Sequence, residues 1–177
     1  MRYAALLRGI NVGGHKKVPM ADLRAVLADL GYADIRTHLQ SGNAVLTSKL
    51  PAGRLEQEIA AAVADRIGVS CAVIVRTAAE LASVAARSPV GAEPEYPSRY
   101  FVAFLSARPD EDRAAALAAQ SFGPDRLWLS GCEAYLWCPN GAADTKLTPP
   151  VLERQLGVRA TARNWNTVTK LVELTSG

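Results

Sequence analysis

The sequence predicts an α+β protein built from two ferredoxin-like subdomains, each a split βαβ unit with the element order βαββαβ. Two observations carry this prediction. The same order of strand and helix patterns occurs twice along the chain, and a proline- and glycine-containing segment, residues 89–98, separates the two occurrences. Apolar residues make up 49% of the chain, which is enough to build a core in each subdomain.

The first occurrence covers residues 1–76. We expect strands at 2–8, 34–40, 44–47 and 69–76, and helices at 19–30 and 55–67. The first helix is predicted from apolar residues at helical spacing: Met20, Leu23, Val26, Leu27 and Leu30. Ser41-Gly42-Asn43 supplies a hairpin turn between the second and third strands.

Residues 77–98 connect the two halves. Thr77 and Glu80 have the spacing of a capping box, which predicts a third helix that ends near Ser88. The proline-rich segment that follows is expected to be a linker.

The second occurrence covers residues 99–162. We expect strands at 99–105, 127–129, 134–138 and 158–161, and helices at 109–121 and 148–156. Right-handed crossovers place both helices of such a unit on one face of a four-stranded sheet.

Residues 163–177 are expected to form a C-terminal helix packed on the core, with its helical turns at about 165–174. Its apolar face consists of Trp165, Val168, Leu171 and Val172. A second face is expected to stay free for solvent or ligand and carries Arg163, Asn166, Thr167 and Lys170.

Composition excludes several classes of protein. No run approaches the ~20 apolar residues that cross a bilayer, and the apolar run between Arg2 and Arg8 is too short for a signal peptide. We therefore expect a cytoplasmic protein that binds no membrane.

The three cysteines lack metal-binding spacing and are interpreted as small buried residues, and the two histidines form no metal motif. No metal or cofactor is expected.

Basic residues gather in two segments that contain no acid. They are Arg2, Arg8, Lys16 and Lys17 within residues 1–17, and Arg159, Arg163 and Lys170 within residues 158–170. If these segments meet, they form one electropositive patch; the alternative is that their charges are scattered and solvated.

The loop after the first strand is the clearest candidate for a binding site in the sequence. Gly9 and Gly14 have the G-x-x-x-x-G spacing of a P-loop, but His15 stands where that motif has lysine and Lys16 where it has Ser or Thr. A magnesium-dependent nucleotide hydrolase is therefore disfavoured. A looser anion site is favoured, with the candidates Arg8, Asn11, Gly13, Gly14, Lys16 and Lys17. The alternative is that Gly13 and Gly14 only permit a tight turn.

Two further polar segments supply candidate ligand-binding residues. The hairpin turn offers Gln40, Ser41 and Asn43, and the start of the last helix offers Arg163, Asn164, Asn166 and Lys170. In each case a structural role is the alternative, because turn residues often bond within their own hairpin and Asn is a good helix N-cap. His15 is the candidate general acid or base, and the sequence does not decide whether the protein is an enzyme.

Three segments resemble the signature blocks of the bacterial domain-of-unknown-function family numbered 1697. They are residues 7–14 with 18–20, residues 40–43, and residues 160–168. This resemblance implies a two-part α/β fold with ferredoxin-like halves. It implies no activity, substrate or cofactor.

Three functions remain open at the level of sequence. The first is a pocket for a small phosphorylated or anionic ligand, built from the first loop and the Arg-Asn-Trp-Asn segment. The second is a nucleic-acid-binding module that stacks bases on strand aromatics, for which the candidates are Tyr100, Phe104, Tyr135 and Trp137. The third is a non-catalytic interaction or scaffold protein. We favour the first, because binding residues tend to lie in loops.

Overall fold

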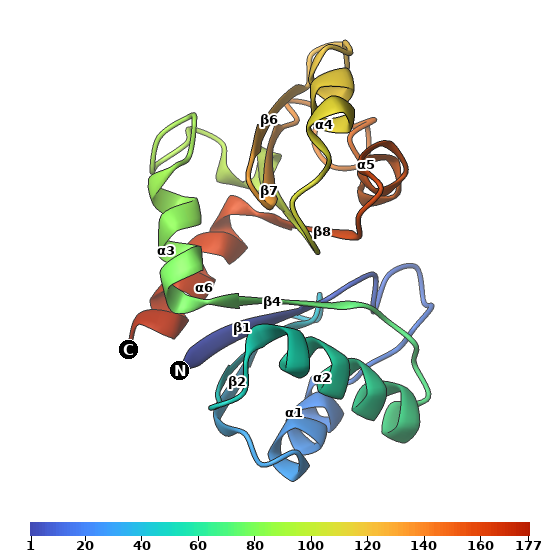
Figure 1. The fold of residues 1–177 in the computed structure, drawn as a ribbon, viewed down its shortest axis with the longest axis vertical. Coiled ribbons are helices and arrows are strands. Elements are labelled where there is room, and N and C mark those ends of the chain that lie inside the picture. Colours follow the sequence, from blue (N-terminus) through green and yellow to red (C-terminus); the bar gives the residue numbers. More distant parts are fainter. The chain divides into compact units, whose positions relative to one another are not determined.

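The protein is α+β, with eight strands and six α-helices (Figure 1). The computed structural model describes residues 1–177. The strands form two four-stranded antiparallel sheets, as the repeated strand pattern predicted. Contacts within the chain divide it into unit 1, which is Met1–Leu81 with Leu171–Gly177, and unit 2, which is Ala82–Lys170.

Unit 1 holds a sheet with the strand order β2-β3-β1-β4. Its elements are β1 (Arg2–Leu7), α1 (Met20–Asp29), β2 (Ala33–His38), β3 (Asn43–Thr47), α2 (Ala52–Ile67) and β4 (Val73–Thr77). Helices α1 and α2 lie on the same side of this sheet (Figure 1). The core between them includes Leu7, Leu23, Leu46 and Ile59, all without exposed surface.

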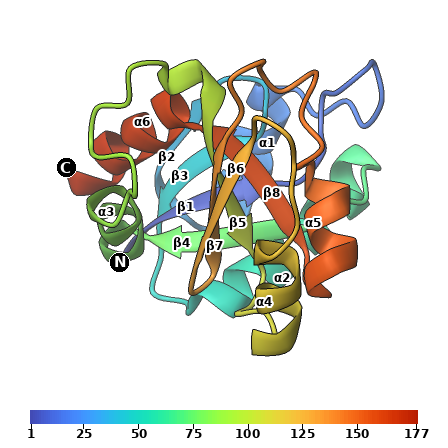
Figure 2. The same cartoon turned by 90° about the horizontal axis from the view of Figure 1, so that it is seen from above.

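Unit 2 repeats this arrangement with the strand order β6-β7-β5-β8. Its elements are β5 (Tyr100–Leu105), α4 (Glu111–Ala118), β6 (Arg126–Ser130), β7 (Glu133–Trp137), α5 (Pro149–Leu156) and β8 (Ala160–Asn164). A short 3-10 helix, Pro97–Arg99, precedes β5. Helices α4 and α5 lie on one side of the sheet (Figure 2), where Leu105, Leu117 and Leu152 form a second core.

The last strand of each repeat continues into a helix without a loop. Helix α3 (Ala78–Ala86) follows β4, and α6 (Trp165–Ser176) follows β8. The predicted capping box is confirmed, because the Thr77 N–H donates to Glu80 Oε2 at 2.7 Å and the Glu80 N–H donates to Thr77 Oγ1 at 3.1 Å. At the same place in the second repeat, Asn164 Oδ1 accepts from the Thr167 N–H at 3.0 Å.

The predicted end of the second repeat was wrong in one respect. The last strand was expected at 158–161, but β8 runs from Ala160 to Asn164, because its pairing with β5 continues through Val102↔Arg163 and Phe101↔Asn164. Arg163 therefore lies in a strand and is 7% exposed, and Thr167 is also buried. Neither belongs to a free helix face.

Smaller differences have local causes. Helix α4 was expected at 109–121 and is shorter; it begins at Glu111 because Asp110 caps it by accepting from the N–H groups of Asp112 and Arg113. Of the three cysteines, Cys138 is buried as predicted, whereas Cys71 and Cys132 are only half-buried. No helix combines the length and the apolar character that crossing a membrane would require.

The two units differ in the connection from their first strand to their first helix. In unit 2 this connection is Ser106–Asp110, and in unit 1 it is the longer segment Arg8–Pro19. The repeat thus shows that the fold can make this connection with a short turn. We refer to residues 8–17 as the first loop.

Candidate functional site

The side chain of Asn11 holds the first loop in place. Its Nδ2 donates to the carbonyl of Val18 at 2.9 Å and to that of Gln40 at 2.7 Å, and its Oδ1 accepts from the Val18 N–H at 2.8 Å. The Asn11 N–H in turn donates to the Lys16 carbonyl at 3.0 Å. One amide group therefore closes the base of the loop and ties it to the β2–β3 turn.

The turn at the tip of the loop is formed by two glycines. Gly13 and Gly14 have φ of 59° and 77°, and the His15 N–H donates to the Val12 carbonyl at 3.1 Å across them. Residues 12–17 are all exposed. The tip is thus a tight turn that is exposed to solvent.

The backbone of the loop is left-handed at several positions. Residues with positive φ are Gly9, Asn11, Gly13, Gly14 and Lys16. Positive φ in a non-glycine residue such as Lys16, at 48°, costs free energy and persists only where surrounding contacts impose it. In this loop the Asn11 hydrogen bonds are those contacts.

The charged groups of the loop are basic. Lys16 and Lys17 are exposed and Arg8 is half-buried, and the first acid along the chain is Asp22. Burial raises the pKa of the Cys71 thiol, while the nearby Lys16 ammonium acts in the opposite direction. The thiol therefore stays protonated at neutral pH, and Cys71 is a poor nucleophile.

The hairpin turn packs directly against the first loop. Gly42 has φ of 85°, and a Cβ there would lie 2.7 Å from Ile10 Cδ1 and 3.0 Å from Leu7 Cβ. Its carbonyl accepts from the Leu7 N–H at 2.9 Å. The structure therefore brings together two segments that are about 30 residues apart in sequence.

The polar groups of the hairpin turn point to different roles. Asn43 is fully buried and its Nδ2 donates to the His38 carbonyl at 2.8 Å and to Ser41 Oγ at 2.9 Å. These bonds lie within the hairpin itself. Gln40, by contrast, is exposed and uses its carbonyl to receive Asn11.

The Arg163–Lys170 segment belongs to unit 2, whereas the first loop belongs to unit 1. The Arg163 guanidinium donates through Nη1 to Thr161 Oγ1 at 2.7 Å and to the Ala162 carbonyl at 2.8 Å. Asn164 caps α6, and Asn166 is exposed. Trp165 is buried as expected, and its Nε1–H donates to the Ala92 carbonyl at 2.9 Å.

Three of the four aromatic residues considered for base stacking are buried in unit 2. Tyr100, Phe104 and Tyr135 are at most 1% exposed, and only Trp137 keeps more surface. The Tyr135 hydroxyl donates to the Val84 carbonyl at 2.7 Å. These three rings offer no stacking platform.

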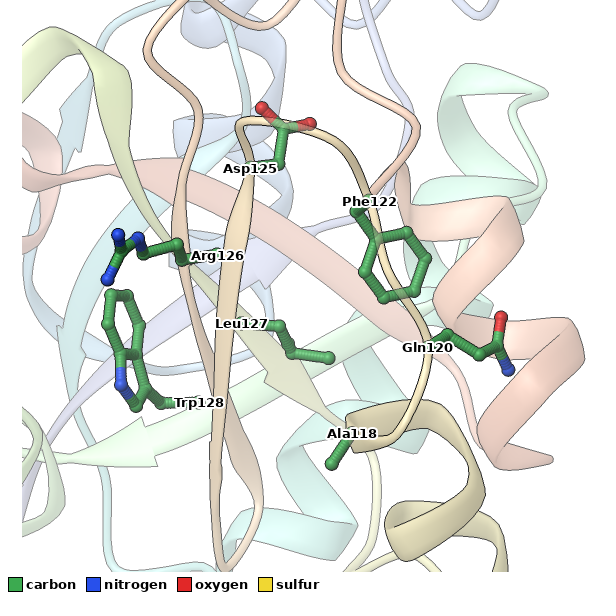
Figure 3. Close-up of a pocket in the computed structure, with 7 residues that line it drawn as sticks. All are labelled: Ala118, Gln120, Phe122, Asp125, Arg126, Leu127 and Trp128. Carbon is green, nitrogen blue, oxygen red and sulfur yellow. The ribbon is translucent and has the colours of Figure 1, made fainter.

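Sequence reasoning missed a hollow of about 320 Å³ beside β6, lined in part by Gln120, Phe122, Arg126 and Trp128 (Figure 3). The only signal for it is the alternation of Arg126, Leu127, Trp128 and Leu129, which puts side chains on both faces of the strand. No three His, Cys, Asp or Glu side chains are grouped closely enough to hold a metal ion.

Asn11→Ala is expected to lower the free energy of unfolding by about 2 kcal/mol, because it leaves the Val18 and Gln40 backbone groups without their partner. Chemical denaturation measures this change. Val12→Ala is the matched control, since Val12 is 67% exposed in the same loop and should change stability by less than about 0.5 kcal/mol. Equal effects of the two substitutions would show that the Asn11 amide does not hold the loop.

These features define a class: an α+β protein of two antiparallel-sheet units, one of which carries an exposed, glycine-rich and basic loop. The chain belongs to the family described as "Protein of unknown function (DUF1697)", which matches residues 1–135. A solved structure, that of the conserved bacterial protein SP0830 from Streptococcus pneumoniae, is similar over 98% of both chains with a TM-score of 0.74 and 23% sequence identity. At 23% identity, this similarity shows that the two proteins share a fold and shows nothing about function. No curated protein matches the chain.

Proposed function

We propose that the first loop of unit 1 binds a small phosphorylated or otherwise anionic ligand. The observation that supports this most directly is the set of five left-handed residues between Gly9 and Lys16. Left-handed residues in such a loop can turn neighbouring backbone N–H groups toward a common point, the arrangement that receives phosphate and other anions. Because Asn11 fixes the loop, these donors need little reorganisation on binding.

The electrostatics of the loop favour an anion. Lys16 and Lys17 add two exposed ammonium groups to the backbone donors, and residues 1–17 contain no acid that would compete for them. Exposed lysines act as point charges rather than as a fork that reads one geometry. They therefore fit a phosphate or carboxylate group without selecting a particular molecule.

The comparison of the two units gives an independent argument. Unit 2 joins β5 to α4 with only Ser106–Asp110, so the fold does not need the longer connection of unit 1. Extra loop length and strained backbone are both expected where a loop has a function beyond connecting two elements. The same comparison, with the strand orders β2-β3-β1-β4 and β6-β7-β5-β8, supports our proposal that each unit is a ferredoxin-like repeat.

Inorganic phosphate, a mononucleotide and a sugar phosphate are the probes for a thermal-shift test. A bound probe at about 100 times its Kd should stabilise the wild type by about 2.7 kcal/mol. The Lys16→Ala/Lys17→Ala variant is expected to lose most of this shift while melting, without ligand, at the wild-type temperature, because both side chains are exposed.

Lys49→Ala is the matched control, since Lys49 is another exposed lysine of the same unit outside the first loop. It should keep the full shift. The proposal fails if no anionic probe raises the melting temperature of the wild type, or if the loop variant and the Lys49 control respond alike.

A further inference from the structure

The outer strands of the two sheets are protected unequally. A sheet of four strands has two edges, and each edge strand presents backbone N–H and C=O groups that another strand can pair with. The four edge strands here are β2 and β4 in unit 1, and β6 and β8 in unit 2.

Both β4 and β8 are blocked by side chains of their own unit. On β4, Glu56 Oε1 accepts from the Val75 N–H at 2.9 Å, and the Arg76 guanidinium donates to the Val75 carbonyl at 3.1 Å. On β8, Glu153 Oε1 accepts from the Ala160 N–H at 2.9 Å, and the Arg163 guanidinium donates to the Ala162 carbonyl at 2.8 Å. The same pair of devices, a helix glutamate and a strand arginine, thus occurs at the equivalent edge of each repeat.

The third edge strand, β2, is irregular. Its pairing with β3 shifts register between Ala33 and Arg36, and Asp34 has φ of 53°. A bulge of this kind bends an edge away from a further partner.

The fourth edge strand, β6, is regular and open. It pairs with β7 without interruption, from Arg126↔Trp137 to Ser130↔Glu133. The Leu105 N–H donates to the Cys132 carbonyl, and the Cys138 N–H donates to the carbonyl of Arg99, the residue before β5. The backbone groups of residues 133, 135 and 137 therefore point the other way, toward β6, and those of their partners Ser130, Trp128 and Arg126 face β7. The backbone groups of Leu127 and Leu129 consequently point outward, and no hydrogen bond within the chain uses them.

Side chains beside this edge leave room for a partner. Arg126 and Trp128 point to one side of β6 and Leu127 to the other (Figure 3). The hollow of about 320 Å³ borders the strand, and a second hollow of about 400 Å³ lies on the Arg126 and Trp128 side, where Trp137 forms part of its wall. In the second half of nearby helix α4 and at its C-cap, the exposed side chains are small: Ala115, Ala116, Ala118 and Ala119.

We propose that β6 pairs with β6 of a second copy of this chain, as an antiparallel two-fold interface centred on Trp128. This register uses every outward backbone group: Leu127 pairs with Leu129 of the second copy, and Leu129 with its Leu127, which gives four hydrogen bonds. Trp128 then lies beside Trp128, and Arg126 lies opposite Ser130. The strand is complementary to itself, because aromatic residues meet, leucines meet and no like charges are opposed within it. The Arg87 guanidinium donates to Ser130 Oγ at 2.9 Å, and its charge is paired with Glu133 Oε2 at 3.1 Å.

The first test is mass in solution. Light scattering should show the wild type at twice the monomer mass of 18.8 kDa. Trp128→Lys and Trp128→Glu should each be monomeric, since each opposes two like charges at the axis, and an equimolar mixture of the two should recover the dimer. Far-UV circular dichroism of the two variants verifies that they are folded. A wild type that stays monomeric at about 1 mM, or that remains dimeric in both variants, would overturn the proposal.

A second test fixes the register and does not depend on charge. Trp128→Cys places two thiols at a pair whose Cα atoms lie about 4.5–5.5 Å apart, within disulfide range, so oxidation should yield a covalent dimer. Arg126→Cys is the matched control on the same strand and face, because its two copies lie about 13 Å apart in this register. Equal crosslinking of the two variants, or crosslinking of the oxidised wild type through its own cysteines, would contradict the assignment. If the chain forms a dimer only when a foreign peptide is bound to β6, the assignment is also contradicted.

Discussion

Gly42→Ala is expected to lower the free energy of unfolding by about 3 kcal/mol, the largest effect of a single methyl group that we expect in unit 1. Gly42 has φ of 85°, which an alanine adopts only with strain. Its added Cβ would also lie 2.7 Å from Cδ1 and 2.9 Å from Cγ1 of Ile10, a side chain that is 1% exposed and has little room to move. Urea denaturation followed by circular dichroism measures the change.

Gly31→Ala separates the two causes. Gly31 has nearly the same φ, 82°, but no atom lies within 4 Å of an added Cβ. This substitution should therefore cost only about 1 kcal/mol, the conformational part of the penalty. If Gly42→Ala costs no more than Gly31→Ala, the first loop does not pack against the hairpin turn as the structure describes.

Arg163→Ala is expected to lower the free energy of unfolding by about 3 kcal/mol. The side chain is buried in unit 2, and its loss leaves a cavity and removes the donor to Thr161 Oγ1 and to the Ala162 carbonyl. Burial lowers the pKa of Arg163 to about 10, so the guanidinium remains charged at neutral pH. Chemical denaturation gives the size of the effect.

Arg159→Ala is the control for this variant, because Arg159 lies one residue before β8 and is exposed. It should change stability by less than about 0.5 kcal/mol. Anion binding distinguishes the remaining alternatives. If folded Arg163→Ala keeps the ligand shift that Lys16→Ala/Lys17→Ala loses, Arg163 is structural and the first loop binds alone. If Arg163→Ala loses the shift although it is folded, Arg163 itself contributes to anion binding.

Much of the fold could be predicted because its helices and strands follow from local sequence patterns. The spacing of Met20, Leu23 and Leu27 predicts α1, and the residues Thr77 and Glu80 predict the start of α3. The end of β8 could not be predicted in this way. Arg163 and Asn164 are polar and resemble a helix start, and only their pairing with β5 keeps them in a strand.

The candidate site was less accessible to sequence reasoning. The glycines and lysines of the first loop are visible as a motif, but the role of Asn11 depends on Gln40, which is 29 residues away. Asn43 was considered a ligand-binding residue, and its full burial with bonds inside the hairpin supports the structural alternative instead. The open edge of β6 was missed, because edge position follows from strand order and not from the composition of the strand.

Unit 1 contains residues from both ends of the sequence, Met1–Leu81 and Leu171–Gly177, whereas unit 2 is continuous. During synthesis on a ribosome, which adds about 5–20 residues per second, residues 82–170 all emerge before unit 1 has its full set of contacts. The sheet of unit 1 can form early, but the unit reaches its full stability only after the end of α6 has been synthesised. Unit 2 therefore has the opportunity to complete its folding first, although it is encoded second.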